Sequence, residues 1–237
     1  MKSLKHILAV PILILILIFT GCLGPSDSKG EIFGSGVKVV SFNALKQVDS
    51  GEQFDLDLLI QNIGDREAKS IQVDLFQTSG IGILNNRVQT TPSLLPPEIE
   101  KGIDGEEHIF TWSLQTPSLT EDQTKSLQAR ITYDYTSTAT SNLYIVSRDE
   151  LREKGEQAIP TYSTSSKGPL TLSIIPMPAF KVNPGQTNAN VQINLIIENT
   201  GFGRVVNNEV RDFKIVLKGE GTEQDITNYC PDSINGV

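Results

Sequence analysis

The amino-acid sequence predicts an all-β protein: an antiparallel sandwich, then a second, partial sandwich module, with a signal or anchor helix at the N-terminus. Three observations lead to this prediction. Apolar and polar residues alternate along most of the chain after residue 36, which is the period of a half-buried strand. Clusters of Gly, Pro, Asn and Ser interrupt the alternation at short intervals. Residues 7–19, in contrast, form an unbroken apolar run.

Residues 1–21 have the order of a secretory signal: basic, then apolar, then small. Lys2 and Lys5 supply the positive charge, and the apolar run from Ile7 to Phe19 contains Pro11. The run matches the signal core of roughly 7–15 residues and is shorter than the roughly 20 residues of a membrane-spanning helix. We therefore predict a cleaved signal peptide, with a single N-terminal transmembrane helix as the alternative. Both place the remainder of the chain outside the cytoplasm.

The end of the apolar run, Ile18 to Cys22, resembles the lipobox of prokaryotic lipoproteins, in which a small residue precedes a Cys that is lipidated after cleavage. Phe19 departs from that pattern, which usually has Leu or another aliphatic residue there. The resemblance implies a lipid on Cys22, and two acyl chains anchor stably because each buried methylene contributes about 0.8 kcal/mol. The alternative is that Cys22 merely follows an uncleaved anchor helix. Residues 22–36, mostly small and polar, are then a tether.

The first module is expected to span residues 37–147 as a series of short strands. Three of these strands carry alternating apolar residues: Val37, Val39 and Phe42; Phe54, Leu56, Leu58 and Ile60; and Ile71, Val73 and Leu75. Further strands are expected at 109–114, 127–133 and 143–146. Six or seven strands in about 110 residues is the size of an immunoglobulin-like sandwich.

The second module, residues 170–237, repeats the layout of the first. Leu170, Leu172 and Ile174 match Val37 and Val39; Val182 to Gly185 matches Val48 to Gly51; Val191 to Gly201 matches Leu56 to Gly64; and Phe213, Ile215 and Leu217 match Ile71, Val73 and Leu75. Residues 148–169 are the expected linker. It begins with a charged stretch that has the composition of a short helix, and it continues as a flexible Ser/Thr/Pro/Gly connection.

Six turn residues recur in the two modules: Gly51, Asn62, Gly64, Gly185, Asn199 and Gly201. In each Asn-x-Gly sequence we expect the Asn side chain to cap backbone groups and the Gly to take a positive φ. These residues are therefore interpreted as folding devices, not as a binding site.

An apolar strand that ends in Asn-x-Gly, followed by a short turn and another alternating strand, resembles the CARDB modules, the cell-adhesion-related domains of bacteria and archaea. Leu56 to Leu75 and Val191 to Leu217 carry the resemblance. It implies extracellular sandwich modules that act as spacers, adhesion elements or scaffolds at a cell surface. It transfers no catalytic residue.

The second module is short for a sandwich, because only 70 residues remain from Gly168 onward, room for about four strands of the usual seven or so. Three explanations compete: the chain is a fragment, its open edge pairs with the first module, or another subunit adds a strand. Cys230 favours a fragment, since a structural cysteine in an oxidising compartment normally has a mate and a lipidated Cys22 is not one. The alternative is a half-buried, unreactive thiol.

No enzymatic, metal or cofactor site is expected. His108 is the only histidine after the signal, which excludes multi-histidine metal sites and argues against His-dependent catalysis. Asp55 and Asp57 lie about 7 Å apart on one strand face. That face is polar, and with Asp74 on a neighbouring strand it has the character of a solvated sheet surface; weak calcium binding is the alternative.

Aromatic residues form the other candidate surface. Trp112, Tyr133, Tyr135 and Tyr144 are either a sugar-stacking platform or, as we expect for rings within alternating strands, core residues.

The net charge of the chain argues against nucleic acid and anionic lipid as partners. The formal net charge is -8, which disfavours nucleic acid and anionic lipid head groups. The prediction is therefore a membrane-tethered, extracytoplasmic structural, adhesion or scaffold protein. The alternatives are a solute- or glycan-binding lipoprotein, and an accessory subunit of a surface machine completed by strand addition at an open edge, 191–197 or 213–217.

Overall fold

The structure is a computed structural model that describes residues 36–142, 145–147, 149, 152–153, 163–176, 180–182, 193–219, 222–225 and 234–235. The expected signal, the Cys22 lipidation site and the tether as far as residue 35 lie outside the described residues. So do Tyr144, Gly185 and Cys230, and so does most of the expected short helix after residue 148.

Among the elements of the described residues, two are short 3-10 helices and the others are strands, in the following order along the chain. In the first module they are β1 (Val37–Ala44), β2 (Gln53–Asn62), β3 (Ala68–Gln77), β4 (Gly82–Ile83), β5 (Val88–Leu94), η1 (Ile99–Lys101), β6 (Glu107–Gln115), β7 (Gln128–Asp134) and β8 (Ala139–Ser141). After these come β9 (Ile145–Ser147), β10 (Ser163–Ser165), β11 (Leu170–Pro176), β12 (Phe180–Val182), β13 (Ile193–Asn199), η3 (Val206–Asn208), β14 (Glu209–Val210), β15 (Val216–Gly219), β16 (Thr222–Asp225) and β17 (Ile234–Asn235).

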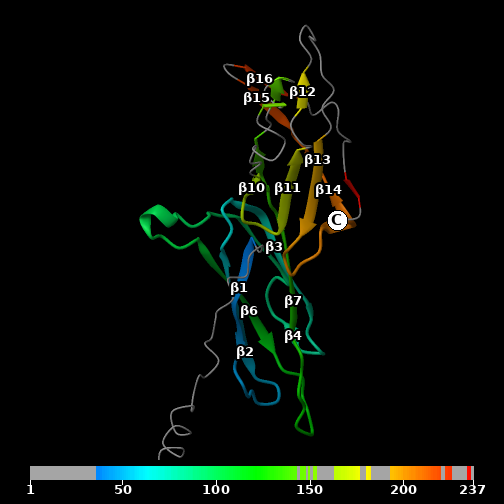
Figure 1. Ribbon diagram of the computed structural model, residues 1–237. Coiled ribbons are helices and arrows are strands. Elements are labelled where there is room, and N and C mark those ends of the chain that lie inside the picture. The colour runs from blue at the N-terminus through cyan, green and yellow to red at the C-terminus, as the bar shows by residue number, and fades with distance from the viewer. Residues whose placement is uncertain are drawn as a thin grey trace, which may run out of the picture. The chain divides into compact units, whose positions relative to one another are not determined.

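Two antiparallel sheets make up the first module (Figure 1). One has the strand order β1-β2-β6-β4 and the other the order β5-β3-β7. In the first sheet, the register places Leu56 opposite Trp112 and Leu58 opposite Phe110. Sheets of four and three strands are the composition of a seven-stranded immunoglobulin-like sandwich. The predicted all-β sandwich is therefore confirmed.

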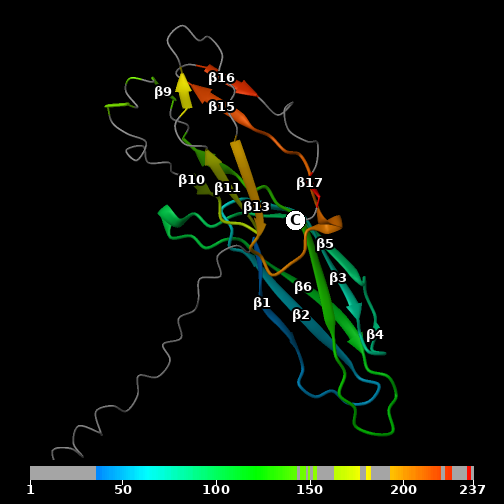
Figure 2. The same ribbon diagram turned by 45° about the vertical axis from the view of Figure 1, so that its right-hand side comes forward.

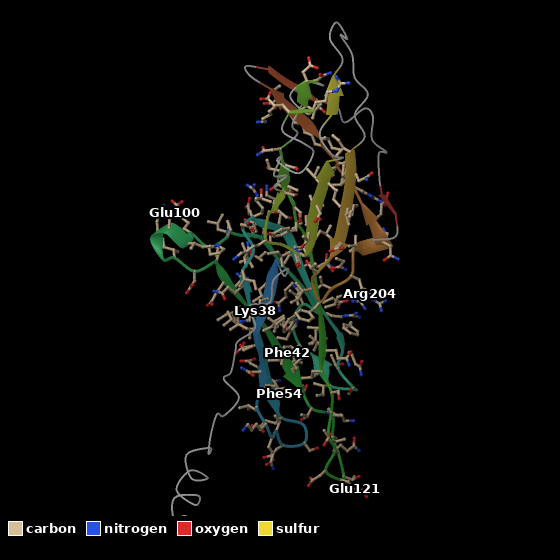
Figure 3. The ribbon with its side chains drawn as sticks, in the orientation of Figure 1. Lys38, Phe42, Phe54, Glu100, Glu121 and Arg204 are labelled. Atoms are coloured by element: carbon tan, nitrogen blue, oxygen red, sulfur yellow. The ribbon has the colours of Figure 1, made fainter. Side chains whose placement is uncertain are left out.

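The core lies between these two sheets, because successive side chains of a strand point to opposite faces. Leu56, Leu58 and Ile60 of β2 are buried, and Phe54 and the half-buried Phe42 contact the same cluster (Figure 3). The other sheet contributes three fully buried residues from β3: Ile71, Val73 and Leu75. The period-two pattern therefore identified the buried faces of β2 and β3. It was wrong for Val39 of β1, which is 47% exposed because the register of β1 shifts between Val39 and Ser41.

Trp112 belongs to this core and not to an exposed aromatic surface. Its side chain is fully buried, and its indole Nε1 donates a hydrogen bond of 3.0 Å to the carbonyl oxygen of Arg87. Its ring stacks against Phe110 at a centroid distance of 6.4 Å. A buried indole needs such a partner for its N–H.

In the second module, the longest described pairing joins β11 and β13 as antiparallel neighbours, with Leu170 opposite Asn199 (Figure 2). This register repeats that of β1 and β2, where Val37 lies opposite Asn62. The internal repeat therefore extends from sequence layout to strand register.

The strand expected at Phe213 to Leu217 is wrong in its bounds. β15 begins only at Val216 and pairs with β16. Three residues just before it, Asn207, Asn208 and Asp212, have positive φ angles. Left-handed backbone of this kind turns the chain and interrupts a strand.

Two strands link the segments expected to belong to separate modules. β10, within the expected linker, pairs antiparallel with β8, and Ser163 lies opposite Ser141. β9, expected to be an antiparallel strand of the first module, pairs parallel with β12 of the second. The described residues of both modules belong to one compact unit.

Replacing Leu58 by Ala should lower the free energy of unfolding of the first module by about 2–5 kcal/mol, because Leu58 is only 2% exposed and its loss leaves a cavity. Urea denaturation followed by the fluorescence of Trp112, the only tryptophan, measures this module directly. Leu45→Ala is the matched control, since Leu45 is 64% exposed and its change should be within about 0.5 kcal/mol. Equal effects of the two substitutions would contradict this assignment of the core.

Candidate functional site

The five-residue loop after β2, Asn62 to Arg66, is here called the first corner. The Asn62 side chain is fully buried. Its Nδ2 donates to the carbonyl oxygens of Arg66 at 2.8 Å and Leu94 at 2.9 Å, and its Oδ1 accepts from the backbone N–H of Gly64 at 3.0 Å. One buried amide therefore caps its own turn and ties that turn to the end of β5. A buried polar group of this kind is tolerated because its hydrogen bonds are made.

The first corner also fixes the start of the module. The backbone N–H groups of Ile63 and Gly64 both donate to the carbonyl oxygen of Gly36, at 2.9 and 3.3 Å. Gly36 directly precedes β1. The end of β2 and the beginning of β1 are thus held together by backbone bonds as well as by strand pairing.

Gly64 does not have the positive φ expected for it. Among the described glycines, positive φ angles occur at Gly51, Gly80 and Gly102. The need for glycine at position 64 is instead steric, because a Cβ there would collide with the hydroxyl of Tyr135. The expected turn conformation was wrong here, and a close approach between two segments replaces it as the reason for the glycine.

Tyr135 lies just after β7 and is surrounded by three glycines. A Cβ at Gly36, Gly64 or Gly168 would meet the Tyr135 ring or its hydroxyl. The hydroxyl donates to the carbonyl oxygen of Lys167 at 2.6 Å and accepts from the backbone N–H of Arg66 at 3.2 Å. Tyr135 therefore bonds both to the first corner and to the segment that leads into β11.

Burial raises the pKa of the Tyr135 hydroxyl above its ordinary value. A tyrosine hydroxyl is protonated at neutral pH, so it can donate to Lys167, and the raised pKa extends this state to higher pH. Burial likewise raises the pKa of Tyr133, whose hydroxyl accepts from the backbone N–H of Val37 at 3.4 Å. The two neighbouring tyrosines thus have different partners, and only Tyr135 reaches the second module's leading segment.

The segment 163–169, expected to be flexible, is bound along its length. Ser166 N–H donates to the carbonyl oxygen of Thr138 at 2.8 Å, and Thr138 N–H donates back to Ser166 Oγ at 2.9 Å. The Asp65 N–H donates to the carbonyl oxygen of Lys167 at 3.2 Å. Together with the pairing of β10 and β8, these bonds form what we call the joint: the first corner, Tyr135 and residues 163–169.

The second module has a matching loop, Asn199 to Gly203, here called the second corner. Asn199 Nδ2 donates to the carbonyl oxygen of Gly203 at 3.1 Å, as Asn62 does to Arg66, the residue four positions on. The N–H groups of Thr200 and Gly201 both donate to the carbonyl oxygen of Pro169, at 3.1 Å each. Pro169 precedes β11 as Gly36 precedes β1. The two corners therefore share the bond from the Asn side chain to the carbonyl four positions on and the pair of N–H bonds to the residue before the first strand.

The remaining residues singled out in the sequence lie apart from the joint. Gly51 has a φ of 80° in the turn before β2. Asp55 accepts from Ser113 Oγ at 2.9 Å and Asp57 from Thr111 Oγ1 at 2.7 Å, both across the exposed face of the first sheet.

Asp74 and His108, the other two residues considered as candidates, each contact a neighbouring side chain. Asp74 forms an ion pair with Arg87 at 2.7 Å, and that hydrogen bond raises the pKa of Arg87. The His108 ring packs edge-on against Phe110 at a centroid distance of 4.6 Å.

Sequence reasoning missed the role of Tyr135 and of Gly36 and Gly168 beside it. The two glycines do not hold matching places, because Gly36 directly precedes β1 whereas Gly168 lies two residues before β11. Nothing in a single sequence connects these glycines to a tyrosine at the end of another strand, since that contact depends on how the chain folds back.

Within the described part of the chain, no cluster of three or more His, Cys, Asp or Glu side chains is placed to hold a metal ion. The same residues include no helix that is both long and apolar enough to cross a membrane. No protein-family model matches this chain, and no curated protein sequence matches it either.

Replacing Asn62 by Ala should destabilise the first module by about 1–3 kcal/mol, because the buried carbonyl of Leu94 loses its Asn62 donor and the Gly64 N–H loses one of its two acceptors. The transition is again followed through Trp112. Asn199→Ala serves as the control: Asn199 is exposed, so the Trp112 transition should stay within about 0.5 kcal/mol of that of the parent protein. Similar shifts for both variants would show that the corner does not depend on burial of its amide.

Tyr135→Phe should loosen the joint without unfolding the module, since it removes the two hydroxyl hydrogen bonds and keeps the ring. Amide hydrogen exchange of residues 163–170 is expected to accelerate roughly fivefold, the factor for about 1 kcal/mol. Tyr133→Phe is the matched control and should leave exchange in that segment unchanged, because its hydroxyl faces Val37. Unchanged exchange in Tyr135→Phe would remove Tyr135 from the joint.

Proposed function

We propose that this chain is a membrane-tethered, extracytoplasmic structural, adhesion or scaffold protein, in which β-sandwich modules of the CARDB kind are anchored to the membrane by an N-terminal lipid on Cys22 and separated from it by the tether of residues 22–36. One observation carries the proposal: the segment between the modules is bound by the joint, through Tyr135 and Lys167. A bound connection transmits position from one module to the next, whereas a flexible linker does not. Transmitting position is what a spacer or scaffold has to do.

The exposed face of the first sheet also supports a structural role. Its carboxylates Asp55 and Asp57 are engaged by neighbouring hydroxyl groups, and Asp74 is engaged by Arg87. Exposed ion pairs and hydroxyl bonds of this kind maintain a solvated sheet surface and contribute little binding energy of their own.

A glycan-binding function draws less support from the same residues. Trp112 is fully buried and Tyr133 packs against the core. Tyr135 is engaged by the joint. A sugar-stacking platform needs ring faces open to solvent, and these three rings are used for packing.

Completion by strand addition is a second candidate, because one edge of the second module favours it. Among the described residues, β13 pairs only with β11. The opposite edge of β11 is occupied, since its Leu172 and Ile174 N–H groups donate to the Oγ atoms of Ser165 and Ser163. Ile196 of β13 is 40% exposed. In this candidate function, a partner protein adds a strand beside β13, and this chain is an accessory subunit of a larger surface assembly.

The test of the tether is the intact mass and membrane partition of the natively expressed protein, compared with Cys22→Ala. We expect a product that begins at Cys22 and carries lipid, and a Cys22→Ala variant that loses lipid and leaves the membrane fraction. Cys230→Ala is the matched control, because it removes the other of the two cysteines and should change neither result. An unprocessed product that stays in the membrane without Cys22 would replace the lipid by a transmembrane anchor.

A further inference from the structure

The last two residues of each corner carry backbone N–H groups. In the first corner these groups bind the joint. In the layout that the two turns share, Phe202 occupies the place of Asp65 and Gly203 the place of Arg66. In the first corner, these two N–H groups donate to Lys167 O and to the Tyr135 hydroxyl, at 3.2 Å each. In the second corner, no described residue accepts a hydrogen bond from either N–H group. Among the described residues, these two donors therefore have acceptors in the first corner and none in the second.

The space around the second corner is open as well. A Cβ added at Gly203 would meet no atom within 4 Å, whereas one added at Gly64 in the first corner would collide with Tyr135. Phe202 is 85% exposed, more than any other large apolar side chain among the described residues. Arg204 comes directly after the corner and is labelled in Figure 3. Exposure of a whole aromatic ring carries a hydration cost that a docked segment would remove.

The first corner also indicates the chemistry of the segment that would dock on the second. In the first corner the docked segment is Lys167-Gly168-Pro169, a bent stretch between β10 and β11 whose lysine carbonyl accepts a corner N–H. Glycine is needed in it because the backbone lies directly against an aromatic ring. At the second corner the exposed ring is Phe202, supplied by the corner itself.

We infer that the second corner is a docking site for the leading segment of a further sandwich module, a short stretch of the Lys-Gly-Pro type. This inference rests on the proposed scaffold function and deepens it, because a corner that docks the next module lets the array continue by repeating one joint. The carbonyl of the docked segment accepts from Phe202 or Gly203 N–H, and its glycine packs on the Phe202 ring.

The probe for this site is a synthetic peptide with the sequence of residues 164–171, TSSKGPLT, added to isotopically labelled full-length protein in detergent micelles. We expect saturable shifts of the Phe202 and Gly203 amide signals at millimolar peptide. The Asp65 and Arg66 amides act as internal controls and should not move, because their partners are already in place. A scrambled peptide of the same composition should produce no saturable shift.

Two variants test whether peptide binding depends on the Phe202 side chain. Phe202→Ser should weaken the peptide roughly threefold or more, the effect of losing part of one buried ring. Leu45→Ser, at an exposed apolar position in the other module, should leave binding unchanged. Both side chains are largely exposed, so the Trp112 transition should stay as in the parent protein.

Absence of shifts at Phe202 and Gly203, or equal shifts with the scrambled peptide, would overturn the inference and leave the second corner an exposed loop. Membrane partition of Cys22→Ala does not depend on the second corner. Failure of the docking site is therefore distinguishable from failure of the proposed tether.

Discussion

The buried side chain of Asn62 is the constraint on which the rest of the first module depends. Its amide bonds to three backbone groups, and these lie in its own turn and at the end of β5. Through Gly64 and Ile63 the same turn is bound to the carbonyl of Gly36, where β1 begins. Strand ends from both sheets are therefore joined at one point. A buried amide with its partners made is worth more to specificity than an apolar side chain of the same size, because each misplaced partner costs an unpaired polar group.

Close backbone approach is the second constraint, and it explains why glycines gather at the joint. Three of them, Gly36, Gly64 and Gly168, face the single ring of Tyr135. Each belongs to a different part of the chain, so the ring acts as a common surface for the start of the first module, its corner and the start of the second. The hydroxyl adds direction, since it bonds to Lys167 and Arg66 at once.

These two constraints connect the fold with the proposed function. A tether positions only the point at which it ends, whereas a joint of backbone and side-chain bonds also positions the module on its far side. Part of the same hydrogen bonding recurs in the second module, where Asn199 binds Gly203 and the N–H groups of Thr200 and Gly201 bind Pro169. A scaffold assembled by repetition needs such a device at each junction, and needs little from the chemistry of its exposed faces. The acidic balance of the chain is then a matter of solubility.

The sequence by itself determined the sandwich fold, the buried faces of strands such as β2 and the repeat of the Asn-x-Gly turns, because alternation and turn chemistry are local properties. Only the tertiary structure decided that residues 163–169 are bound, since Ser, Thr, Gly and Pro suit a free linker and a bound strand equally. It also decided that Gly64 is required by the Tyr135 ring and not by its own φ, and that the strand expected at Phe213 begins later. These features depend on contacts between residues distant in sequence, which local patterns do not encode.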